Sequence, residues 1–382
     1  MQKLLPEEQE KISLSLIKKT LFVLFCGLPF ANFFLQKVDI WHSQGYFFQF
    51  GALVLYCLHI FRKNKELSIF LFWSGLTTFC WFISFQIRNN QYAAKLFFPF
   101  FNLLCMVIFY DLLTKYLDKK IAFKLFKTIS IVTLIVMIYC IFQILNLDQF
   151  YKPSGSETKK EIVGIIGNPM HLAHYLAISI PFFFALKPIY AKTLVSLALL
   201  VIFFTGSVSG IAVAISIIAY CLYFKRIFKV KELILTGLIG SNLLVWKFHN
   251  LHNLIKDFTF SSGRINLWKF FYPMFQKQCY TGWGLGIVNE VAKVPQAAGW
   301  RHLHFELYHF GIELGLIGVG IIIWGIIAYY KKFIRSQKDD TAIISVGVFT
   351  AFFLCSFFGF PAHLWLLSSL GMFGYAGLYL EE

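Results

Sequence analysis

The feature that most constrains this chain is a series of apolar runs, each about 20 residues long, that recurs along its whole length. A helix of this length crosses the hydrocarbon core of a bilayer. The composition agrees, because 58% of the 382 residues are hydrophobic and only 14% are charged. A soluble chain of this size needs more charge to cover its surface. The sequence therefore predicts an all-α, polytopic integral membrane protein.

The apolar runs define about twelve transmembrane helices in a single transmembrane domain that comprises residues 1–382. A long extracytoplasmic loop, residues 248–305, is expected between spans nine and ten. Within this loop, the stretch RINLWKFFYPMFQKQ has the pattern of an amphipathic helix that lies along the outer membrane surface. The predicted spans are 20–36, 46–61, 67–86, 94–113, 128–146, 164–186, 189–205, 208–224, 232–247, 306–330, 341–357 and 362–380.

The positions of lysine and arginine predict the orientation of the spans. Most of the 35 basic residues fall on one side if the N-terminus is placed in the cytoplasm, and an even number of spans then leaves both termini cytoplasmic. The net charge of +16 accordingly reflects topology and contact with anionic membrane lipids. Because the basic groups are scattered between spans, no nucleic-acid partner is expected.

Ionisable groups are scarce inside the spans and gather instead where the spans meet the outer face. An ion-coupled transporter needs titratable groups near the middle of the membrane, and these are few. This scarcity speaks against a transporter or flippase, a class of protein that carries its substrate across the membrane. The outer-face groups are Asn168, His171, His174, Ser207, Ser209, Arg264, Arg301, His302, His304, Tyr308, His309 and His363.

Arginine and histidine at a lipid–water boundary suit one kind of chemistry. An arginine holds a diphosphate through paired, charge-assisted hydrogen bonds. A neutral histidine accepts the proton of a hydroxyl nucleophile. Together they suit the transfer of a sugar from a lipid-linked diphosphate. The sequence shows no acidic cluster for a divalent metal, so we expect a metal-independent reaction without a cofactor.

Four stretches resemble the O-antigen ligase and O-antigen polymerase superfamily of bacterial membrane glycosyltransferases. They share the order and spacing of that family's motifs over about residues 160–380. The last two apolar runs also resemble the family's last two spans. The four stretches are GIIGNPMHLAHYLAISIPFFFAL, SSGRINLW, YTGWGLG and HFELYHFGIELGLIG.

The resemblance implies a role for two residues and a location. His304 would be the general base, and Arg264 would contact the diphosphate of an undecaprenyl-type carrier. The protein would lie in the bacterial plasma (inner) membrane, with its active site on the periplasmic or outer face. A ligase would use a glycolipid or other surface acceptor, and a polymerase would use a second lipid-linked glycan. Both possibilities stay open at this point.

Three positions depart from the family's pattern. Met170 and Phe305 stand where the family usually has asparagine, and Val208 stands where many members carry an arginine. These departures leave a third interpretation, an inactive scaffold of a glycan-assembly complex. Arg301 or Lys277 would be the replacement for an arginine lost at position 208.

Further residues are candidates for substrate contact, and a smaller set is expected to be structural. His302 is the rival of His304 for the role of base. Glu313 follows His309 by one helical turn, so a structural pair is expected. Gly311, Gly315 and Gly318 have the spacing of close helix packing. The candidates for substrate contact are Arg301, His302, Asn168, His171, Tyr308 and Lys277.

Overall fold

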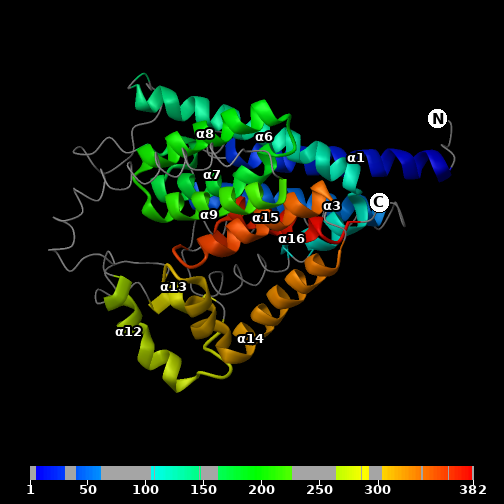
Figure 1. Ribbon diagram of the computed structural model, residues 1–382. Helices are drawn as coiled ribbons and strands as arrows, with labels where there is room; N and C mark the ends of the chain where they lie inside the picture. Colours follow the sequence, from blue (N-terminus) through cyan, green and yellow to red (C-terminus); the bar gives the residue numbers. More distant parts are fainter. Residues whose placement is uncertain are drawn as a thin grey trace.

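The computed structural model describes residues 6–30, 40–61, 105–106, 108–145, 147, 162–225, 264–284, 286–291, 303–336, 339–359 and 361–380. Every element within these ranges is helical (Figure 1). Three of the described helices are long and apolar enough to cross a membrane, namely α6 (Lys119–Ile144), α8 (Pro188–Thr205) and α14 (Glu306–Arg335). The helical fold class is confirmed, whereas the count of about twelve spans stays a prediction. Predicted spans 67–86 and 232–247 lie outside the described residues.

Helices lying side by side form a bundle (Figure 1). The bundle has one continuous apolar core. α7 lies near its centre, because every side chain from His171 to Phe183 is buried. Short 3-10 turns, η1 (Leu28–Phe30), η2 (Gly164–Ile166) and η4 (Pro361–His363), accompany the long helices. The bundle contains α1 (Pro6–Gly27), α3 (Ile40–Phe61), α6, α7 (Pro169–Phe183), α8, α9 (Val208–Lys225), α15 (Asp340–Cys355) and α16 (Trp365–Gly377).

Local signals set the helix ends that surround the later site. Asn168 caps α7 with its side-chain oxygen, and Pro169 occupies the first helical position, where no backbone N–H is needed. Gly206 ends α8 in the left-handed conformation, with φ of 77°. α9 begins two residues later. α7 and α9 therefore begin, and α8 ends, at the same end of the bundle.

The largest differences between the predicted spans and the helices lie at the starts of α1 and α6. The first predicted span was 20–36, but α1 begins at Pro6 and ends at Gly27. The fifth was 128–146, but α6 begins at Lys119 after a cap in which Asp118 Oδ1 accepts from Ile121 N at 2.7 Å. Hydropathy locates the apolar part of a helix, whereas the hydrogen-bonded helix continues into the neighbouring polar residues.

α14 connects the bundle to a smaller helical unit, which we call the loop unit (Figure 1). Near its start, α12 (Arg264–Lys277) and α13 (Ile287–Val291) pack with it around a separate apolar core. This core contains Leu267, Phe271, Val288, Leu303 and Ile312. Near its end, Tyr329 and Phe333 join an aromatic cluster with α15 and the residues after α16. α12 coincides with the predicted amphipathic helix, whose position on the membrane surface stays a prediction.

α14 is interrupted at Gly315, which has φ of 67° and ψ of −174°. The N–H groups of Leu316 and Ile317 donate to Cys279 O at 2.7 Å and Tyr280 O at 3.2 Å. In return, Ile312 O accepts from Trp283 N and Glu313 O accepts from Gly284 N, both at 2.9 Å. An unbroken helix would have joined these four α14 groups to each other. The segment 279–284 thus replaces the missing helical hydrogen bonds, and we call it the clasp.

One of the regularly spaced glycines in α14, Gly315, packs against the clasp and not against another helix. A Cβ on Gly315 would collide with Tyr280 O, and a Cβ on Gly282 would collide with the backbone of Glu313. Both glycines also have positive φ, which L side chains adopt at a cost. Gly315 therefore permits close approach of a loop, whereas helix–helix packing was expected.

Candidate functional site

His304 lies in the short connection between Leu303 and the start of α14. Its φ is 56°, and it is the one non-glycine residue with positive φ among the residues that the structure describes. Such a conformation is uncommon outside glycine and is often found where function requires it. The His304 side chain is only 9% exposed. The backbone turn therefore places an imidazole inside the protein, immediately before α14.

Arg264 is the first residue of α12, and it reaches the bundle. Its Nη2 contacts the Met170 sulfur at 3.9 Å, at the start of α7. Its buried Nε has no hydrogen-bond acceptor among the described residues. Burial lowers the pKa of Arg264, but a guanidinium stays protonated at neutral pH. The site thus contains a half-buried cation with unused donor capacity.

The electrostatics of His304 show which residues lie around it. Its pKa is lowered to about 3, mainly by burial and then by the charges of Arg264, His174 and His309, in that order. His171 also interacts electrostatically with His304. An imidazole with this pKa is neutral at pH 7 and has a lone pair to accept a proton. His304 and Arg264, separated by 40 positions along the chain, belong to one cluster.

Two serines at the start of α9 extend this cluster into the bundle. His174 Nε2 lies 3.1 Å from Ser209 Oγ, which in turn lies 3.2 Å from Ser207 Oγ. The turn after α15 closes over His174, because a Cβ on Gly359 would lie 2.9 Å from the His174 ring. His174 therefore bonds a neighbouring helix while also contributing to the field at His304.

Glu306 anchors the start of α14 to the bundle, a role that sequence reasoning did not assign. Its backbone N–H donates to Ser356 O at 2.9 Å, and its Oε1 accepts from Ala362 N at 2.7 Å. Ser356 and Ala362 lie in the connection between α15 and α16. The sequence signal was present, because a glutamate at the first helical position satisfies backbone donors near it. The partner, however, comes from another part of the chain.

The predicted structural pair in α14 is confirmed. His309 Nε2 lies 3.1 Å from Glu313 Oε1, and both side chains are buried. The same Glu313 oxygen accepts from Gly286 N at 2.8 Å, directly after the clasp. Glu313 thus connects the first part of α14 with the loop unit.

The remaining candidates for substrate contact lie in several places. The Asn168 oxygen accepts from Met170 N and His171 N, so it serves as the cap of α7 while its amide nitrogen takes no part in that cap. The Tyr308 hydroxyl donates to Trp268 O at 3.0 Å. Lys277 is exposed at the far end of α12, about 20 Å from Arg264 along the helix. Arg301 and His302 lie outside the described residues, and substrate contact stays a prediction for all five.

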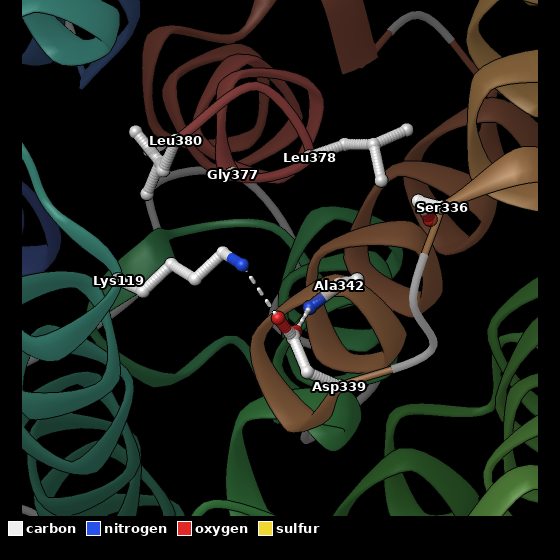
Figure 2. A pocket seen from close by; sticks show the side chains of 7 residues that line it. All are labelled: Lys119, Ser336, Asp339, Ala342, Gly377, Leu378 and Leu380. Carbon is white, nitrogen blue, oxygen red and sulfur yellow. Dashed lines mark hydrogen bonds and ion pairs between the residues drawn. The ribbon is translucent and has the colours of Figure 1, made fainter. Parts of the chain in front are cut away.

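Figure 2 shows a pocket lined by residues where α6 and α15 begin and α16 ends. This is the other end of the bundle from the cluster, where α7 and α9 begin and α15 ends. Its Lys119 Nζ pairs with Asp339 Oδ2 at 2.9 Å, and Asp339 Oδ1 caps α15 by accepting from Ala342 N at 2.7 Å. Asp339 and Ser356 flank α15, whose length is about 24 Å. The cation of this pocket is already neutralised, so the pocket has the character of a structural contact. Its lining residues are Lys119, Ser336, Asp339, Ala342, Gly377, Leu378 and Leu380.

Fold and site together define a class of protein, a helical chain with membrane-length apolar helices and a buried arginine–histidine cluster where several helices begin or end. Residues 193–323 match the family model for O-antigen ligase. The matched range contains most of α8, all of α9, the loop unit and the first part of α14, and so both Arg264 and His304. No curated protein and no solved structure matches the chain significantly. Within the described residues, no group of three histidine, cysteine or acidic side chains is placed to hold a metal ion.

Proposed function

We propose that this protein is a membrane glycosyltransferase of the O-antigen ligase type. It transfers a glycan from an undecaprenyl-diphosphate-type carrier to an acceptor hydroxyl on the outer face of the bacterial plasma membrane. His304 is the general base, and Arg264 stabilises the diphosphate. The observation that carries this proposal is the meeting of His304 and Arg264 in one buried cluster within the range that matches O-antigen ligase.

The proposed reaction is a single displacement. The acceptor oxygen forms a bond to the anomeric carbon while its proton passes to the neutral His304 imidazole. The bond between the anomeric carbon and the diphosphate oxygen breaks, and the electron pair leaves with the diphosphate. Arg264 faces the negative charge that grows on this leaving group. The diphosphate also offsets the field of Arg264, so its arrival raises the pKa of His304 and makes the imidazole a stronger base.

The packing around Phe305 supports a competent site despite the departure from the family's asparagine. The Phe305 ring lies 6.0 Å from the Trp268 ring and 5.9 Å from the Phe357 ring. Phe305 therefore packs between α12 and the end of α15, which holds the backbone next to His304. This position supports the site by packing and supplies no polar group to it.

The surroundings of Val208 supply other polar groups where many relatives carry an arginine. Val208 begins α9 and is 46% exposed. The neighbouring Ser207 and Ser209 hydroxyls face each other, and Ser209 contacts His174. We propose that Arg264 and this His–Ser group together contact the donor diphosphate.

The test is a transfer assay in membranes with a purified lipid-linked glycan donor. His304→Ala and Arg264→Ala should each lower transfer by at least about 100-fold, the usual range for loss of a general base or of a charge-stabilising group. Matched controls are His59→Ala and Arg335→Ala. His59 bonds Tyr116 in another part of the bundle, and Arg335 is exposed in the last turn of α14.

The product of the same assay identifies the acceptor. One glycan joined to a non-carrier glycolipid indicates a ligase, whereas a ladder of carrier-linked glycans indicates a polymerase. Parent-level transfer by both His304→Ala and Arg264→Ala would reject the proposed roles. Movement of the donor across the membrane without any new glycosidic bond would indicate a flippase instead.

A further inference from the structure

We propose that Trp268 is the positioning residue that fixes His304 against Arg264. This proposal deepens the proposed function and rests on it. Trp268 lies one turn after Arg264 on the same helix. Its Nε1 donates to Leu303 O at 2.7 Å. Leu303 is the residue directly before His304. One hydrogen bond therefore connects the helix that carries Arg264 to the backbone next to the His304 imidazole.

A second hydrogen bond closes the connection from the other side of His304. The Tyr308 hydroxyl donates to the backbone oxygen of Trp268 at 3.0 Å. Trp268 is thus held to the residue before His304 by its side chain and to the residue four after it by its backbone. Two such ties to one short segment restrict rotation of that segment as well as its distance from α12.

The conformation of His304 explains why such ties are needed. A left-handed backbone is unfavourable for a non-glycine residue and persists only where surrounding contacts impose it. Leu303 is fully buried in the core of the loop unit, and Phe305 packs on the Trp268 ring. The indole therefore holds both neighbours of His304, one by a hydrogen bond and one by ring contact.

The chain offers a matched control for the loss of this hydrogen bond. Trp283 Nε1 donates to Met274 O at 2.8 Å, a bond of similar length but greater exposure within the same loop unit. Met274 lies ten residues beyond Arg264 on α12 and does not adjoin His304. Trp268→Phe and Trp283→Phe each remove one indole N–H bond and keep an aromatic ring. Tyr308→Phe removes the second tie.

The test measures kcat, KM for the lipid-linked donor and thermal stability for each variant. Trp268→Phe should lower kcat about tenfold, the rate equivalent of one lost hydrogen bond, with KM changed less than about twofold. Tyr308→Phe should lower kcat in the same direction. Trp283→Phe should lower the melting temperature by no more than Trp268→Phe, because its bond is more exposed, and leave kcat at the parent value. Equal kcat values for Trp268→Phe and Trp283→Phe would overturn the proposal.

A combined variant shows whether Trp268 acts through His304. In a His304→Ala background, Trp268→Phe should cause no further loss of the residual transfer, because there is no imidazole left to position. A further tenfold loss in that background would show an independent effect and overturn the positioning role. Parent-level transfer by His304→Ala would reject the proposed function together with this inference. If His304→Ala is inactive but Trp268→Phe transfers at the parent rate, this inference alone is rejected.

Discussion

His304 combines three properties that rarely occur together in one residue. It is buried, it lies in a left-handed backbone conformation, and its pKa is lowered to about 3. Burial keeps the imidazole neutral, and the backbone turn aims it inward. Neutral imidazole is the form that accepts a proton, so the residue is prepared for general-base catalysis before the substrate arrives.

The lowered pKa of His304 predicts an unusual pH dependence. Because the free protein keeps this imidazole neutral until the pH falls far below its ordinary value of 6.5, kcat/KM should not decline as the pH is lowered through 6.5. The acid limb of kcat should lie at higher pH than that of kcat/KM, since bound diphosphate raises the pKa of His304. Profiles of both constants from pH 4 to 8 check this, and a one-proton decline of kcat/KM near 6.5 would contradict it.

The backbone of His304 predicts a difference between two inactive variants. Both His304→Gly and His304→Ala lose the imidazole, but glycine adopts a positive φ freely. His304→Gly should therefore have a free energy of unfolding about 1 kcal/mol higher than that of His304→Ala. Its unfolding midpoint should be higher accordingly. Equal midpoints would mean that the left-handed turn is not maintained in the protein.

At the scale of elements, the junction between α14 and the clasp determines where the site is built. The clasp accepts and donates the hydrogen bonds that α14 leaves open at Gly315, and Glu313 binds both His309 and Gly286. At its other end, this first part of α14 is anchored by Glu306 to the connection between α15 and α16. His304 therefore lies just before a short helical segment that is fixed at both ends.

Alanine substitutions along α14 should have opposite effects on stability. Gly315→Ala forces a Cβ against Tyr280 O at a positive φ, and it should lower the free energy of unfolding by more than about 2 kcal/mol. Gly320→Ala is the matched control, because a Cβ there meets nothing within 4 Å. It should leave stability unchanged or raise it by up to about 1 kcal/mol. Thermal or denaturant unfolding in detergent measures both, and equal effects would contradict the clasp.

The elements also show how far sequence reasoning reaches. Spans predicted at 189–205 and 208–224 agree with α8 and α9 to within one residue, because Pro188 and Gly206 mark their ends. The amphipathic helix α12 followed from its pattern. The start of α1 at Pro6 did not, because a helix continues through polar residues that a hydropathy window excludes.

Within the site, the sequence predicted which residues take part but not which hydrogen bonds hold them in place. The sequence motifs singled out Arg264 and His304. The bond from Trp268 to Leu303, the anchor at Glu306 and the break at Gly315 each depend on a backbone partner distant in sequence. Such partners are set by tertiary packing, which no local pattern encodes.

At the scale of the whole molecule, polar contacts separate into two ends of the bundle. One end has the arginine–histidine cluster, where α7 and α9 begin and α15 ends. The other has ion pairs that join Lys18 to Asp118 and Lys119 to Asp339, at 3.8 Å and 2.9 Å. These contacts agree with the alternation of directions in the predicted topology, in which Lys119 and Asp339 share the cytoplasmic side.

The predicted sidedness can be measured by labelling one introduced cysteine at a time in intact cells, with the Cys279→Ser protein as the blank. In a background with Cys279→Ser, Lys277→Cys should react with a membrane-impermeant maleimide from outside, since it lies in the predicted outer loop and is exposed. Arg335→Cys, exposed in the last turn of α14, should react only after the membrane is opened. The reverse pattern would invert the topology, and labelling of both from outside would contradict a membrane-spanning α14.

The central claim is that Arg264 and His304 act on one substrate as a unit, and a double-mutant cycle tests it most directly. Single-turnover transfer from a lipid-linked diphosphate donor would be measured for the parent, Arg264→Ala, His304→Ala and the double variant. Residues that act as a unit are strongly non-additive. We predict that each single change lowers the rate by at least about 100-fold and that the double variant is no slower than the slower single variant. Losses that multiply in the double variant, or single variants as fast as the parent, would contradict a shared site.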